Sequence, residues 1–201
     1  MKELFPIEIF SGFSRNQRAV KVRSLHFDPF KTRLARDIRN NLSKSFLQAL
    51  AEKDVSVFQR CTADFLQQNS EPPYAHYLKE RLARYEEAYA IIEKRKLKKI
   101  LQQVPILWYL KLYFEMHELL ELEWKKAEGG RRRALQGLIR AAGMKIHAEN
   151  NNGKVAVSMG VKALADLMRY RDELTDLVPL EAILADIKQT LSTAPKTTEV
   201  E

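Results

Sequence analysis

The sequence predicts an all-α protein, a helical bundle with a central antiparallel helical hairpin at about 106–149 and an N-terminal helical extension. Glycine and proline are scarce, seven of each in 201 residues, and they stand mainly between the segments expected to form helices. Apolar residues recur at intervals of three and four along much of the chain, the period of a helix packed on one side. Hydrophobic residues make up 45% of the chain, which argues against wholesale disorder.

The first predicted helix follows an N-terminal segment of different character. We expect residues 1–27 to form short extended pieces or an arm laid over the body. Asp28 and Pro29 then give a helix start, an N-cap acceptor followed by proline at the first helical position. The helix should end near Asp54. Its apolar positions have helical spacing: Phe30, Leu34, Ile38, Leu42 and Phe46.

The next part of the chain predicts two more helices. Asp54 can cap a helix over 55–68, and the stretch NSEPP at 69–73 then interrupts the chain. A long helix over about 74–99 follows, since this segment is rich in helix-forming and charged residues. Pro105 should end or kink that pattern.

The hairpin is predicted from two helices and a short turn. Helices over 106–127 and 131–149 are separated by Gly129-Gly130, and NNNG at 150–153 ends the second. A further helix is expected at 154–174, and Pro179 should open a last short one. The resulting division is an N-terminal arm (1–27), an N-terminal helical region (28–103), a helical domain (104–175), a closing helix (176–192) and a disordered tail (193–201).

Positive charge is concentrated in three clusters, although the net charge is only +8. The stretch 15–44 holds nine Lys/Arg against two Asp, KRKLKK at 94–99 adds five, and 131–133 adds three. Such clusters attract anionic partners such as nucleic acid, unless they are solvated helix faces. The candidate residues are Arg33, Arg36, Arg39, Arg131, Arg132 and Arg133.

Composition also excludes several classes of protein. Cys61 is the sole cysteine, so neither an intramolecular disulfide nor a zinc site of several cysteines can form. No apolar run approaches the roughly 18–20 residues of a membrane span, and the N-terminus lacks the pattern of a secretory signal. We therefore expect a soluble, cytoplasmic protein. Helical hairpins with wide apolar faces often dimerise, so a homo-oligomer stays open.

The segment HELLELEW, residues 117–124, carries the polar residues of greatest chemical interest. On a helical wheel Glu121 lies about 40° from His117, and Trp124 lies about 20° away on the other side. Both belong to the most aromatic face of the helix, whereas Glu115, Glu118 and Lys125 point elsewhere. A carboxylate on a buried face is costly unless it is paired, so Glu121 requires a partner.

The following helix offers candidate partners for Glu121. His147 shares a stripe with Gly143, Arg140 and Gln136, and Gly143 would allow a facing helix to approach closely. Because residues equidistant from the turn meet in an antiparallel hairpin, we expect Gln136 or Arg140 beside Glu121, and His147 a turn or two further away.

The pattern HxxxExxW at 117–124, followed by QGLIRAAGMKIH at 136–147, resembles the signature of the domain of unknown function 309 family. The resemblance covers roughly residues 104–170 and implies a small all-helical bundle. It implicates His117, Glu121, Trp124 and His147, with Gln136 and Gly137 in the supporting helix. Two departures are Arg140, where the family usually has glutamine, and NNNGKVAV after the last histidine. The family has no agreed activity.

Three interpretations of these residues remain. In the first, His117, Glu121 and Trp124 form a buried hydrogen-bonded network that fixes the packing of the hairpin. In the second, His117, Glu121 and His147 hold a divalent metal ion that activates water for hydrolysis. In the third, they line a metal-free binding or catalytic pocket. We favour a non-enzymatic structural or partner-binding module, with a metal-dependent hydrolase as the alternative; whether the protein is an enzyme stays open, and no cofactor is certain.

Overall fold

The computed structural model describes residues 26–175 and 180–193, and in these ranges the protein contains α-helices, one short 3₁₀ helix and no strand. The predicted all-α class is therefore confirmed. No helix in the described ranges has the length and apolar character needed to cross a membrane. Most of the predicted arm, the basic residues before His26, Pro179 and the tail from 194 onward lie outside the described residues.

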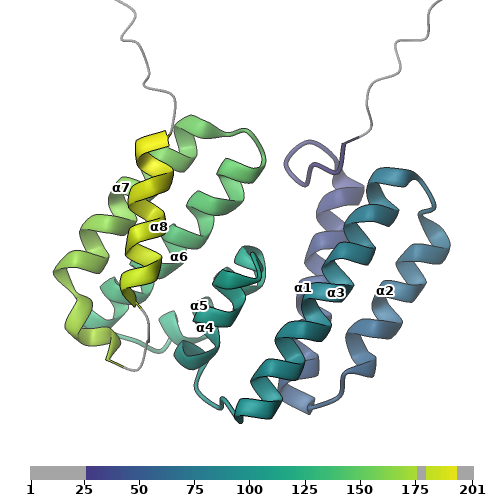
Figure 1. Ribbon diagram of the computed structural model, residues 1–201, viewed down its shortest axis with the longest axis horizontal. Coiled ribbons are helices and arrows are strands. Elements are labelled where there is room, and N and C mark those ends of the chain that lie inside the picture. Colours follow the sequence, from purple (N-terminus) through teal and green to yellow (C-terminus); the bar gives the residue numbers. More distant parts are fainter. Residues whose placement is uncertain (1–25, 176–179, 194–201) are drawn as a thin grey trace, which may run out of the picture.

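The helices form two groups with a short pair between them (Figure 1). The first group holds α1, α2 and α3, the second holds α6, α7 and α8, and α4 and α5 lie between the two. The bounds are α1 Arg33–Glu52, α2 Ser56–Gln68, α3 Pro72–Arg95, α4 Ile100–Tyr109, α5 Tyr113–Trp124, α6 Gly129–Glu149, α7 Gly153–Arg169, the 3₁₀ helix η1 Arg171–Leu174 and α8 Leu180–Thr193. The predicted domain boundaries stay predictions.

The first helix begins later than predicted. Thr32 is the N-cap of α1 and accepts a hydrogen bond from the amide of Ala35. The carboxylate of Asp28 instead accepts from the amide of Phe30 at 2.9 Å, and the carbonyl of Asp28 accepts from the amides at 31 and 32. Asp28 and Pro29 therefore form a tight turn ahead of the helix, because an aspartate can satisfy an amide two residues on.

The predicted helix over 106–127 is two helices. Pro105 lies inside α4, and the chain breaks after Tyr109, where Lys111 adopts a left-handed backbone with φ 55°. The amide of Leu112 donates to the carbonyl of Leu107 at 2.8 Å, and the side chain of Leu112 is fully buried. This hydrogen bond and contact close the end of α4 as a glycine cap would. Lys53 and Lys96 have the same backbone conformation after α1 and α3.

Two glycines inside α6, Gly137 and Gly143, face α7 rather than α5. A Cβ atom on Gly137 would lie 2.9 Å from Leu167 Cγ, and one on Gly143 would meet the end of Met159. The space beside Gly143, where a facing helix was expected to approach, is filled by the end of the Met159 side chain of α7. The hairpin of α5 and α6 packs beside this pair, with residues 125–128 as its connection.

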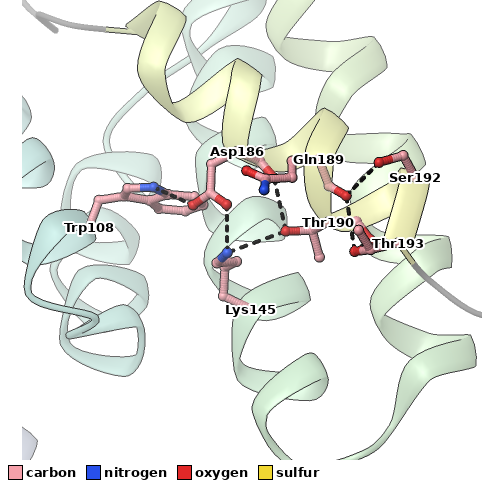
Figure 2. Close-up of polar contacts among 7 residues, drawn as sticks. All are labelled: Trp108, Lys145, Asp186, Gln189, Thr190, Ser192 and Thr193. Atoms are coloured by element: carbon pink, nitrogen blue, oxygen red, sulfur yellow. Dashed lines mark hydrogen bonds and ion pairs between the residues drawn. The ribbon is translucent and has the colours of Figure 1, made fainter.

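The carboxylate of Asp186 links α8 to α4 and α6 (Figure 2). Asp186 accepts from the indole N–H of Trp108 at 3.0 Å and from the ammonium of Lys145 at 2.8 Å. Lys145 also lies 5.7 Å from the Trp108 ring centre and donates to Thr190. Trp108 is thus part of a buried junction between α4, α6 and α8.

Candidate functional site

The motif residues His117 and Glu121 form a pair at the surface. Nε2 of His117 lies 3.2 Å from Glu121 Oε1. The side chain of His117 is 26% exposed to solvent and that of Glu121 is 38% exposed. Lys125, one turn on, lies 3.6 Å from the other oxygen of Glu121. The expected burial of Glu121 is therefore wrong, because both of its partners come from its own helix and water reaches the carboxylate. Nδ1 of His117, by contrast, is buried and has no partner among the described residues.

His147 lies in a separate environment. Its ring stacks on Phe30 at a centroid distance of 4.7 Å, which joins the turn before α1 to the end of α6. Burial lowers the pKa of His147, and its Nδ1 has no hydrogen-bond partner in the described part of the chain. Among residues 26–175 and 180–193, no three His, Cys, Asp or Glu side chains are placed to hold a metal ion. His117, Glu121 and His147 thus do not form the metal site of the second interpretation.

Trp124 and Gln136 line a shallow hollow with three arginines. Its volume is about 420 Å³, and its walls are Trp124, Gly129, Arg132, Arg133, Gln136 and Arg140. The guanidinium of Arg132 lies 4.1 Å from the Trp124 ring centre. Arg140 forms an ion pair with Asp166 of α7, so it is not the partner expected for Glu121. We call this feature the hairpin hollow, since it lies where the turn between α5 and α6 leads into α6.

The remaining candidate arginines do not form one patch. Arg33 is highly exposed and pairs with Asp37 on its own helix, and Arg36 donates to the carbonyl of Pro29. Arg39 turns inward, and its guanidinium lies 3.9 Å from the ring centre of Phe114 in α5. Arg131 donates to the backbone carbonyl of Glu173 at 2.5 Å. Of these six candidate arginines, Arg132 and Arg133 line the hairpin hollow, and Arg33, Arg36, Arg39 and Arg131 do not.

The most deeply buried charged residue escaped the sequence analysis. Glu115 has no exposed surface, and it accepts from the hydroxyl of Tyr85 at 2.6 Å and from Arg81 at 3.2 Å. Burial, and then the charge of Glu115, raise the pKa of Tyr85. Burial, the largest single effect, lowers the pKa of Arg81, but the interactions with Glu115 and with Tyr77, Tyr85 and Glu149 together raise it, and the net shift is upward. Glu115 is therefore a bridge between α5 and α3.

A helical wheel of α5 alone could not locate this bridge. The wheel places Glu115 off the aromatic face, which suggests exposure for a helix packed on one side. In the structure α5 packs against α6 and also against α1, so two of its faces are covered. A usable signal was a tyrosine and an arginine four apart in the preceding long helix, Arg81 and Tyr85, which share one face.

Comparisons with known proteins found one match, between a segment of the chain and a protein family. No curated protein and no solved structure matches the sequence. Residues 101–159 match the family described as Domain of unknown function (DUF309), and they span from α4 into α7 with all the signature residues. Residues 101–159 are therefore similar to the domain of unknown function 309 family, the resemblance that the sequence pattern indicated.

Proposed function

We propose that this protein is a binding module that holds single-stranded nucleic acid at the hairpin hollow. The observation that carries the proposal is that the motif residues Trp124 and Gln136 line one hollow together with Arg132, Arg133 and Arg140. Guanidinium groups bind phosphates, and an indole beside them offers a surface for a base. The lining side chains include no common nucleophile or general base, which favours binding over catalysis.

The charges around the hollow favour an anion. Asp166 neutralises Arg140, whereas neither Arg132 nor Arg133 has an ion pair among the described residues, and Arg132 lies over the Trp124 ring. The hollow also lies at the N-terminus of α6, a helix of 21 residues whose N-cap makes no side-chain hydrogen bond. Its first amides therefore add partial positive charge to that of the arginines.

One side of this helix end is already occupied. Glu173 lies beside Gly130, where an added Cβ atom would come within 2.5 Å of its carboxylate, and the backbone of Glu173 accepts from Arg131. Gly129 faces open space instead. A phosphate would therefore approach from the Trp124 side, over Arg132 and Arg133.

Fluorescence anisotropy with a labelled single-stranded RNA tests the proposal. An oligonucleotide of about 20 residues exceeds the ~4–16 nucleotides that single-strand-binding domains usually cover. We expect binding that weakens as salt rises from about 50 to 200 mM, because phosphate contacts release counterions. The double variant Arg132→Glu/Arg133→Glu should lose about tenfold or more in affinity at low salt.

Two matched variants control for net charge. Lys154→Glu/Lys162→Glu makes the same charge change on exposed positions of α7, and Arg33→Glu/Arg36→Glu makes it on α1. Neither should weaken binding as much as the change at the hollow. Absence of binding at low salt would contradict the proposal, and so would equal losses in all three variants.

A further inference from the structure

A second cavity, unconnected with the family signature, lies between the N-terminal helices and the DUF309 domain. Its volume is about 310 Å³, the lower end of the range for small-molecule sites. Residues from α1, α3, α5 and α6 and from the turn before α1 form its walls. We call it the interface cleft. Its polar lining includes Arg39, Tyr77, Arg81, Arg84, Lys111 and Glu149.

Cations outnumber carboxylates around the interface cleft. Arg81 is balanced by Glu115 behind the wall, and Arg84 by Glu80 on its own helix. Of the remaining charged residues that line the cleft, Arg39 and Lys111 are basic and Glu149 is acidic. Arg39 donates to the neutral side chain of Asn40, and Lys111 has no ion pair in the described part of the chain. An excess of positive charge therefore remains in a partly enclosed space.

The hydroxyl of Tyr77 is the second indication of a ligand. It is buried, it belongs to a residue that lines the cleft, and it has no hydrogen-bond partner among the described residues. Phe27 covers the ring at a centroid distance of 3.6 Å, so the side chain is held in place. Burial raises the pKa of Tyr77, which keeps the hydroxyl protonated as a donor. Buried polar groups in proteins are nearly always satisfied, so this donor is suited to an acceptor that enters the cleft.

We propose that the interface cleft binds a small organic phosphate. Its phosphoryl oxygens would accept from Lys111, from Tyr77 and from the arginines of the wall, which together supply more donors than a carboxylate can use. The apolar part of the ligand would lie against Phe114, Ile146 and Pro29. Because the walls come from both helical groups, the ligand would also hold them together.

Thermal unfolding of the full chain with three probes tests this site. The probes are inorganic phosphate, glycerol 3-phosphate and adenosine 5′-monophosphate, each at about 10 mM, with sodium chloride at matched ionic strength as reference. A ligand that binds the folded state raises Tm. We expect at least one probe to raise Tm by several degrees, and unphosphorylated adenosine to raise it by none.

Two variants show whether the stabilisation comes from the cleft. Tyr77→Phe removes a hydroxyl that has no partner in the free protein, so the free variant should be as stable as the parent. Its affinity for the probe should fall about tenfold or more, because a hydrogen bond to an anion is lost. Lys111→Asn removes the charge with a residue that tolerates the left-handed backbone, and it should weaken binding as well.

Lys53→Asn is the matched control, since Lys53 has the same backbone conformation, φ 57° against 55°, and does not line the cleft. It should bind the probe like the parent. The proposal is overturned if no probe raises Tm above the salt reference, or if Tyr77→Phe and Lys111→Asn keep the parent's response. Arg132→Glu/Arg133→Glu should leave this response unchanged, so the two proposed sites can fail independently.

Discussion

Two glutamates on one helix have opposite environments. Glu115 and Glu121 both belong to α5, six residues apart, and each has a basic partner at about 3.2 Å. Glu115 is fully buried and bonds to Tyr85 and Arg81 of α3, whereas Glu121 is 38% exposed and pairs within its own helix. The contrast teaches that an ion pair of a carboxylate does not by itself show how much the carboxylate stabilises the fold. That contribution depends on which helices cover the pair.

The physical consequence is a difference in what each pair contributes. An exposed ion pair adds about 0–1 kcal/mol, because water and salt screen it and the side chains lose freedom. Removing one member of a buried pair costs about 3–5 kcal/mol, since the remaining charge stays in a poorly solvated site. The Glu115 bridge should therefore dominate the attachment of α5 to α3, although the family signature does not include it.

Glu115→Ala should have the largest effect. It leaves Arg81 and the hydroxyl of Tyr85 buried without their acceptor, and we expect the free energy of unfolding to fall by about 3–5 kcal/mol. Urea denaturation followed by circular dichroism measures this. Glu115→Gln, which keeps an acceptor for Tyr85, should cost less. A loss below about 1 kcal/mol for the alanine variant would show that the bridge is not a buried charge pair.

Asp186→Ala should have an intermediate effect. The change leaves the indole of Trp108 and the ammonium of Lys145 without their shared acceptor. We expect a loss of about 1–2 kcal/mol, because the hydrogen bonds involve charge but the carboxylate is partly exposed. Hydrogen exchange should show α8 losing protection before the rest of the domain. Ser192→Ala, on the same helix (Figure 2), serves as the control and should leave protection unchanged.

His147 should make stability depend on pH. Burial lowers its pKa in the folded state, so the unfolded chain binds more protons just below the ordinary value of about 6.5. The stability that neutral His147 contributes to the folded state is fully present above about pH 6.5 and declines as pH falls below it. Tm measured at pH 7.5 and 5.5 should therefore differ less in His147→Gln than in the parent. His76→Gln, at an exposed position, provides the comparison; an unchanged slope in His147→Gln would refute the assignment.

Glu121→Gln should have the smallest effect and completes the contrast with Glu115. Since the carboxylate is exposed and its partners are one turn away, we expect a change within about 0.5 kcal/mol. Glu123→Gln, on the same helix with a similar exposed pair, should behave alike. If Glu121→Gln alone lowered the free energy of unfolding by more than about 2 kcal/mol, His117, Glu121 and Trp124 would again have to be interpreted as a buried network.

The sequence located much of the fold but misplaced several helix ends. Asp54 was expected to cap α2; the N-cap is Val55, and the carboxylate of Asp54, one residue earlier, accepts from the amide of Ser56. The ends of α1, α3 and α4 were harder, because Lys53, Lys96 and Lys111 adopt the left-handed backbone that sequence analysis assigns to glycine. A lysine carries no local sign of this conformation, which accompanies backbone hydrogen bonds at the helix ends and, after α4, the burial of Leu112.

The candidate site was predicted as a set of residues rather than as an arrangement. His117 and Glu121 do pair, since residues four apart on a helix are neighbours in any tertiary context. His147 and Arg140 found other partners, Phe30 and Asp166, which lie on segments far from α5 in the sequence. Those contacts depend on how α7 and the turn before α1 lie against α6, and no spacing within the motif encodes that.

The sequence by itself determined the helical class, the presence of a hairpin, the match of residues 101–159 to a family and the basic clusters, because these follow from local periodicity and composition. It misplaced the turn, since Gly129 and Gly130 begin α6 and residues 125–128 form the connection. Only the tertiary structure decided which charges are buried, which arginines gather around a hollow, and that a cleft separates the two helical groups. Burial is set by what packs against a face, and a helix cannot specify its neighbours through its own period alone.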